Sequence, residues 1–260
     1  MLVHGYPTSS WDWCRIWGAL SEQRTLYACD MLGFGLSDKP RSGYSIRQQA
    51  DLHEALLDHL GIESFDAVFH DYGDTVGQEL LARRNEGSGF TGVERVVLLN
   101  GGLFPEQHRL RPIQKIGVGP FGFLVGLLMN RQRFGAAFSE VFGPQAQPTE
   151  AELDEHWRLI ATNNGHRIAH KLLHYVAERR RYRERWVGAL QGAAVPVKLI
   201  CGGADPVSGR HMFDHFVELV PGADAVCLDQ IGHYPQLEAP DRVLLEIFQF
   251  LEQREADIPG

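Results

Sequence analysis

Three polar residues far apart in the chain stand where a nucleophile, an acid and a base could meet. Asp71 lies between an apolar run and a segment with helical spacing, and a strand-turn-helix elbow holds a nucleophile at such a position. A carboxylate there would form an ester by displacement at a saturated carbon. A lone aspartate before a helix can equally be an N-cap, so its partners decide the assignment.

Two later segments supply these partners. Asp205 follows the apolar run 197–201, and His233 follows the run 225–228. Both would lie at the carboxyl edge of a parallel sheet, where open sheets bind ligands. A carboxylate on one ring nitrogen of His233 would fix its tautomer and stabilise its imidazolium. The order of these residues predicts Asp71 as nucleophile, Asp205 as orienting acid and His233 as water-activating base.

A turn after the first apolar run could complete such a site. Residues 4–10, HGYPTSS, can present the backbone N–H of Tyr6 toward the elbow, and the N–H of Tyr72 follows the nucleophile directly. Two such donors would form an oxyanion hole for the tetrahedral species that arises when water attacks the ester. Neither tyrosine side chain is needed for this role.

The elements that position these groups follow from alternating apolar runs and helical segments, a pattern typical of a parallel sheet flanked by helices. The expected strands are residues 2–4, 25–29, 66–70, 95–99, 197–201 and 225–228. Helical spacing is found at residues 45–60, 77–84 and 242–252. Since Met1 already stands inside a strand, we expect further strands upstream of it.

The alternation stops after Leu99 and resumes only at Val197, with helix formers and aromatic residues between them. This predicts a core of residues 1–103 and 191–260 that carries an inserted helical cap, residues 104–190. The arginine cluster of that cap, residues 179–185, is interpreted as a solvated helix face paired with nearby acids rather than as an anion-binding site.

The longest apolar run of the cap, residues 116–129, is too short to span a bilayer and is broken by four glycines. We interpret it as a lid lining a pocket rather than as a patch that dips into a membrane surface. No stretch of the sequence is long enough for a membrane span, and none has the pattern of a signal peptide.

The composition limits the kinds of molecule that the protein is expected to bind. The formal net charge of −8 gives no attraction to nucleic acid, so a small uncharged substrate is expected. The four cysteines show neither CxxC nor metal-ligand spacing, which argues against a zinc site and a disulfide framework and favours a reducing, cytoplasmic location. The chemistry requires no cofactor and no metal, and the oligomeric state is not indicated.

The segments HGYPTSSWDW, DMLGFGLSDKP, HDYGD, DPV and GHYPQLE resemble the epoxide hydrolase and haloalkane dehalogenase branch of the α/β-hydrolases. The resemblance implies an α/β-hydrolase fold with the three catalytic roles assigned above. Dehalogenases of this branch usually carry Trp after the nucleophile, where this chain has Tyr72. Epoxide hydrolases generally use two cap tyrosines as proton donors, and this cap offers Tyr175 and Tyr182. Tyr182 lies among arginines that would lower its pKa, while the helical phase leaves Tyr175 open.

The sequence therefore predicts a hydrolase that opens small apolar epoxides through an ester on Asp71. Haloalkane dehalogenation by the same three residues is an alternative, and so is a non-catalytic protein that keeps the fold for binding. Asp74 has no role in this scheme. Its carboxylate would favour a helix N-terminus but would repel a second anion nearby.

Overall fold

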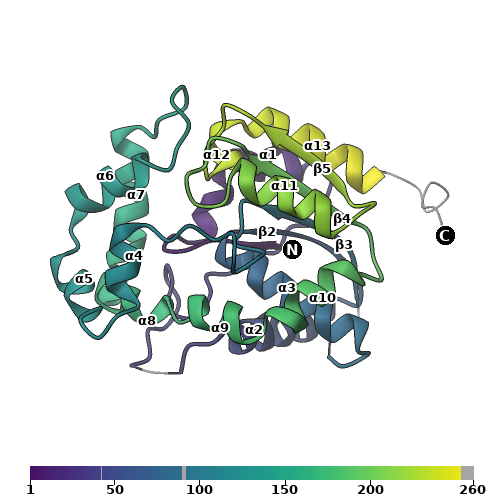
Figure 1. The fold of residues 1–260 in the computed structure, drawn as a ribbon, viewed down its shortest axis with the longest axis horizontal. Coiled ribbons are helices and arrows are strands. Elements are labelled where there is room, and N and C mark those ends of the chain that lie inside the picture. The colour runs from purple at the N-terminus through teal and green to yellow at the C-terminus, as the bar shows by residue number, and fades with distance from the viewer. Residues whose placement is uncertain (42, 90–91, 253–260) are drawn as a thin grey trace.

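A parallel β-sheet forms the centre of the molecule (Figure 1). The computed structural model describes residues 1–41, 43–89 and 92–252. In these residues five strands lie side by side in chain order, β1 (Leu2–Val3), β2 (Phe65–His70), β3 (Val93–Leu99), β4 (Val197–Gly202) and β5 (Asp224–Leu228). Every neighbouring pair is parallel, which confirms the predicted fold class.

The alternation of side chains along the strands explains the two helical layers. Val68, Val97 and Leu99 pack on one face of the sheet with residues of α1 (Cys14–Ser21) and α13 (Pro240–Glu252). The next residues in each strand point to the other face. That face is covered by α2 (Ile46–His59), α3 (Tyr72–Asn85), α10 (Arg183–Gln191) and α11 (Arg210–Leu219).

The strand predicted at residues 25–29 is wrong. Ala28 makes only an isolated parallel bridge with Leu2, and the Leu2 N–H donates to the Tyr27 carbonyl at 2.8 Å. The described β1 is two residues long, and after it the chain turns at His4, whose Nε2 accepts from the Met31 N–H. Because β1 is so short, residues 25–29 have too few partners on it to form a strand of their own.

The segment between β3 and β4 is helical, as predicted. Its elements before α10 are α4 (Pro112–Gly117), α5 (Phe123–Leu128), α6 (Arg131–Ser139), α7 (Glu150–Ala161), the 3₁₀ helix η2 (Thr162–Ile168), α8 (Ala169–Leu172) and α9 (Tyr175–Arg181). Helices α4 to α8 stand to one side of the sheet (Figure 1). None of the helices in the described part of the chain combines the length and apolarity that crossing a membrane requires.

Helix α10 returns to the sheet layer and packs along α3 (Figure 1). The Trp186 indole N–H donates to Glu79 Oε2 at 2.8 Å, and Arg185 pairs with the same carboxylate. Residues at the end of the predicted cap thus contact the core directly, and the division at residues 103/104 and 190/191 stays a prediction. The two remaining short helices are η1 (Ser10–Trp13) and α12 (Pro235–Glu238).

Candidate active site

Asp71 lies at a strained turn between β2 and α3. Its backbone has φ 47° and ψ −101°, a conformation that is costly for a residue with a side chain and is found mainly at functional turns. The turn also needs a small residue at Gly73, because a Cβ there would lie 2.5 Å from the Val3 carbonyl oxygen. Asp71 makes no side-chain capping bond to α3, which argues against the N-cap interpretation.

The Asp71 carboxylate instead faces the loop after β1. The Tyr6 N–H donates to Asp71 Oδ2 at 3.0 Å, and Tyr72 supplies the first N–H of α3 directly after the elbow. The structure thus brings the Tyr6 N–H to the elbow, as the sequence predicts. Such a donor can hold the carboxylate before reaction and its carbonyl oxygen afterwards.

The loops after β4 and β5 bring Asp205 and His233 together. His233 Nδ1 lies 2.8 Å from Asp205 Oδ2. The same carboxylate accepts from the Asn100 side-chain amide, the Val207 N–H and the Ser208 N–H and hydroxyl, at 2.7–3.1 Å. Five donors therefore fix one orientation of this acid, and the acid fixes the imidazole.

Burial and charge act in opposite directions on this pair. Burial favours the neutral form of Asp205, but the charge and hydrogen bond of His233, with the other donors, lower its pKa to about 2. Burial favours neutral His233, but the carboxylates of Asp205 and Asp71 outweigh it and raise the pKa of His233 to about 9. The carboxylates of Asp205 and Asp71 thus favour the imidazolium form of His233 in the resting state.

The raised pKa of His233 predicts a pH-dependent contribution to stability. The pKa is about 9 in the folded chain and 6.5 in the ordinary imidazole of an unfolded chain, so the contribution is full below pH 6.5 and is lost as pH rises through 9. At ~1.4 kcal/mol per unit, the loss is on the order of 3 kcal/mol. Urea unfolding at pH 6 should show a higher free energy of unfolding for wild type than for His233→Gln. This difference should shrink at pH 10. A constant difference, or a similar change for the exposed His59→Gln, would refute the assignment.

Asp74 is fully buried beside the elbow. Its Oδ1 accepts from the Leu99 N–H at 3.4 Å, and its Oδ2 has no hydrogen-bond partner among the described residues. Burial, with the nearby charge of Asp71, raises the pKa of Asp74 well above its usual value. The shift favours the protonated form of Asp74, in which the repulsion between two anions is absent.

The raised pKa of Asp74 predicts that Asp74→Asn stabilises the chain at neutral pH. In the unfolded chain this acid ionises above about pH 4, so folding must take up a proton and its cost grows as pH rises. Asparagine has the same shape and no proton to take up. Denaturant unfolding should show Asp74→Asn to be more stable than wild type at pH 8, with the advantage vanishing near pH 3. If Asp74→Asn instead loses stability relative to wild type as pH rises from 3 to 8, Asp74 is ionised in the folded chain.

The two cap tyrosines take different positions. Tyr175, at the start of α9, is 1% exposed, and its ring centroid lies 5.1 Å from that of Tyr72 and 6.2 Å from that of Tyr6. Its hydroxyl has no hydrogen-bond partner among the described residues, and burial raises its pKa well above the usual value. Tyr182 packs instead on Trp186 and under the Arg47 guanidinium. The structure therefore brings Tyr175 to the elbow and leaves Tyr182 at the α9–α10 junction.

Arg179 is a buried site residue that the sequence interpretation missed. It is 2% exposed, and its guanidinium donates to the Asp71 carbonyl at 3.0 Å and to the Thr75 hydroxyl at 2.7 Å. It also lies 4.4 Å from the centre of the Tyr175 ring. Its spacing of four from Tyr175 places both on one helix face, which is the signal that could have found it. Arg183 and Arg185 do pair with acids, as expected.

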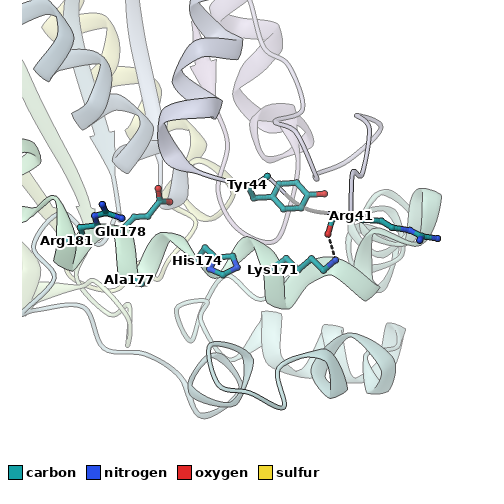
Figure 2. A pocket seen from close by; sticks show the side chains of 8 residues that line it. Arg41, Tyr44, Lys171, His174, Ala177, Glu178 and Arg181 are labelled. Carbon is teal, nitrogen blue, oxygen red and sulfur yellow. Dashed lines mark hydrogen bonds between the residues drawn. The ribbon is translucent and has the colours of Figure 1, made fainter.

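A separate pocket of ≈ 470 Å³ lies between α8, α9 and the loop before α2 (Figure 2). Its lining includes Arg41, Tyr44, Lys171, His174 and Glu178, and Lys171 Nζ bonds the Arg41 carbonyl. None of the predicted catalytic residues lines it. Asp71 and His233 are 4% and 5% exposed, so these predicted catalytic residues are shielded from water, which strengthens the charge interactions between them.

The parallel sheet, the elbow after β2, and an acid and a histidine in the loops after β4 and β5 define an α/β-hydrolase-type fold. The chain belongs to the alpha/beta hydrolase family, whose model matches residues 1–246. It is 43% identical over 252 residues to the mesoderm-specific transcript homolog protein of Bos taurus, which covers 92% of this chain and 74% of that protein. In the sequence, the resemblance to this relative is carried by the segments HDYGDTVGQELL, LNGGLFPEQHR and RWVGAL.

Solved structures share the fold at low identity. The epoxide hydrolase CorEH matches with a TM-score of 0.76 at 21% identity, over 96% of this chain and 89% of that one. A haloalkane dehalogenase variant, DbeA-M1 from Bradyrhizobium elkanii, matches with a TM-score of 0.78 at 20% identity, over 96% and 87%. At this identity the similarity shows the fold alone, and it confirms the predicted resemblance to this group of structures.

Proposed function

We propose that this chain hydrolyses small, apolar, uncharged epoxides to diols through an ester on Asp71. The observation that carries the proposal is the position of Tyr175, whose buried hydroxyl makes no hydrogen bond among the described residues and whose ring packs beside Tyr72 at the elbow. A hydroxyl kept protonated by burial is available to donate to an epoxide oxygen.

In the first step, a carboxylate oxygen of Asp71 attacks a ring carbon and the carbon–oxygen bond of the epoxide breaks. The released oxygen takes the proton of Tyr175, which becomes a phenolate. Esterification removes the negative charge of Asp71, one of the charges that raise the pKa of His233. The pKa of His233 then falls, so the imidazolium gives its proton to the Tyr175 phenolate and the neutral imidazole can act as a base.

In the second step, neutral His233 takes a proton from water, and the hydroxide attacks the ester carbonyl carbon. The Tyr6 N–H stabilises the oxyanion of the tetrahedral species, which collapses to release the diol and restore the Asp71 carboxylate. The proton taken from water stays on His233 and restores its imidazolium, while the hydroxyl proton of the tetrahedral species passes to the leaving alkoxide. The balance is therefore one epoxide and one water to one diol. No cofactor or metal enters this sequence.

The test is a screen of the purified chain against an aryl epoxide, a terminal bromoalkane and a p-nitrophenyl ester, with Asp71→Ala as the control. We expect diol from the epoxide with wild type and none with Asp71→Ala. Halide release without diol would replace the proposal with the dehalogenase alternative. Ester cleavage alone, or no turnover of any substrate, would contradict the assignment of an epoxide-opening nucleophile.

A further inference from the structure

The outer surface of the cap carries a dense apolar ridge, which we define as residues 113–128 of α4, α5 and the turn between them. Its large apolar side chains are exposed, with Phe121 at 65%, Leu127 at 60% and Leu128 at 57%. The others are Ile113, Ile116, Val118, Phe123 and Leu124. The interpretation of residues 116–129 as a lid lining a pocket is therefore wrong for these side chains, which face outward.

In the ridge, small residues face the protein and large apolar residues face outward. Gly117 and Gly126 face the protein, because a Cβ on them would lie 2.4 Å from Leu173 Cδ1 and 2.6 Å from the Arg167 carbonyl oxygen. Small residues thus make the close contact with α8 and η2, and the large apolar residues project away from the fold. A surface helix in water usually does the opposite, and an apolar patch of this kind marks an interaction site.

The chain segments around the ridge carry cations and no acids, although Arg111 and Arg131 pair with acids from neighbouring segments. Residues 107–139 contain five Lys and Arg and no Asp or Glu, and residues 162–177 contain Arg167 and Lys171 and again no acid, in a chain of net charge −8. Lys115 and Arg167 are exposed, and neither makes an ion pair in the described part of the chain. The ridge is therefore an apolar surface that carries two exposed cations, Lys115 and Arg167, on a molecule of negative net charge.

We propose that the apolar ridge docks on an anionic lipid bilayer. Large apolar side chains between cations are what an interfacial element needs, since the apolar groups enter the headgroup boundary and the cations meet lipid phosphates. The short helices α4 and α5 would lie in the plane of the surface and would not cross it. Docking would hold α4 and α5 at the source of apolar substrates.

The experiment is flotation of the full chain with vesicles of phosphatidylcholine alone and of phosphatidylcholine with 30% phosphatidylglycerol (about 7:3). We expect binding to the anionic vesicles at ~0.1 M salt, at least about tenfold weaker binding at ~0.5 M salt, and weak binding to pure phosphatidylcholine. Phe121→Ser/Leu127→Ser should abolish vesicle binding. Lys115→Gln/Arg167→Gln should weaken it on anionic vesicles only.

The matched control is Leu60→Ser/Leu245→Ser, which removes two apolar residues of 45% and 44% exposure outside the ridge and should bind as wild type does. Circular dichroism melting of each variant checks the fold. Equal binding by the ridge variant and wild type would overturn the proposal. It would also be overturned if wild type binds no vesicles but forms a dimer that Phe121→Ser/Leu127→Ser dissociates in analytical ultracentrifugation, since the occupant would then be a second copy.

Discussion

The His233→Ala variant is expected to accumulate an ester on Asp71 when it is incubated with a reactive epoxide. Attack on the epoxide needs the Asp71 carboxylate and the Tyr175 proton but not His233, whereas hydrolysis needs a base beside the ester. His233 is fixed for that task by its 2.8 Å contact with Asp205. Steady turnover should fall by roughly 10² to 10⁴, the usual cost of a lost general base, while the adduct persists. Peptide mass spectrometry should show Asp71 heavier by the mass of the epoxide.

The position of the adduct makes this experiment decisive. Asp74 lies three residues away on the same peptide, so fragment ions must assign the modified carboxyl. Asp71→Ala/His233→Ala should show no adduct, and the exposed His59→Ala should turn over epoxide as wild type does. An adduct on Asp74, or trapping that survives the loss of Asp71, would remove Asp71 as the nucleophile.

The positions of Asp71, Asp205 and His233 were predictable because each follows an apolar run that forms a parallel strand. Parallel strands present their carboxyl ends at one edge, so residues distant in sequence must meet there. The structure places these residues after β2, β4 and β5. The apolar runs and the parallel order of the strands are enough to predict where such residues lie.

Residues that act through tertiary packing were not predictable in the same way. Asn100 and Ser208 support Asp205, but asparagine and serine in loops have many ordinary roles and no spacing marks these two. Arg179 stands in an arginine-rich segment in which Arg183 pairs with Glu106 and Arg185 with Glu79. Only the packing of α9 against the elbow shows that this arginine is buried.

The choice between the cap tyrosines depended on a helix break that periodicity could not locate. Tyr175 and Tyr182 are seven residues apart, which on one continuous helix would place them on the same face. The chain leaves helical geometry at Tyr182, where φ is −108° and ψ is 21°, and α10 begins in a new direction. The two side chains therefore reach different neighbours, Tyr72 for Tyr175 and Trp186 for Tyr182.

This separation makes Tyr175→Phe a sharp test of epoxide chemistry, with Tyr182→Phe as its matched control. An epoxide opens readily only if its developing alkoxide receives a proton, so Tyr175→Phe should lower epoxide turnover by about 10² to 10⁴ and Tyr182→Phe should change it little. Because the Tyr175 hydroxyl makes no hydrogen bond among the described residues, its loss should leave the thermal midpoint nearly unchanged. Single-turnover kinetics with an aryl epoxide should place the loss in ester formation rather than in hydrolysis. Full activity of Tyr175→Phe would remove Tyr175 as the donor, and an equal loss in Tyr182→Phe would show that its position at the helix junction is no barrier to proton donation.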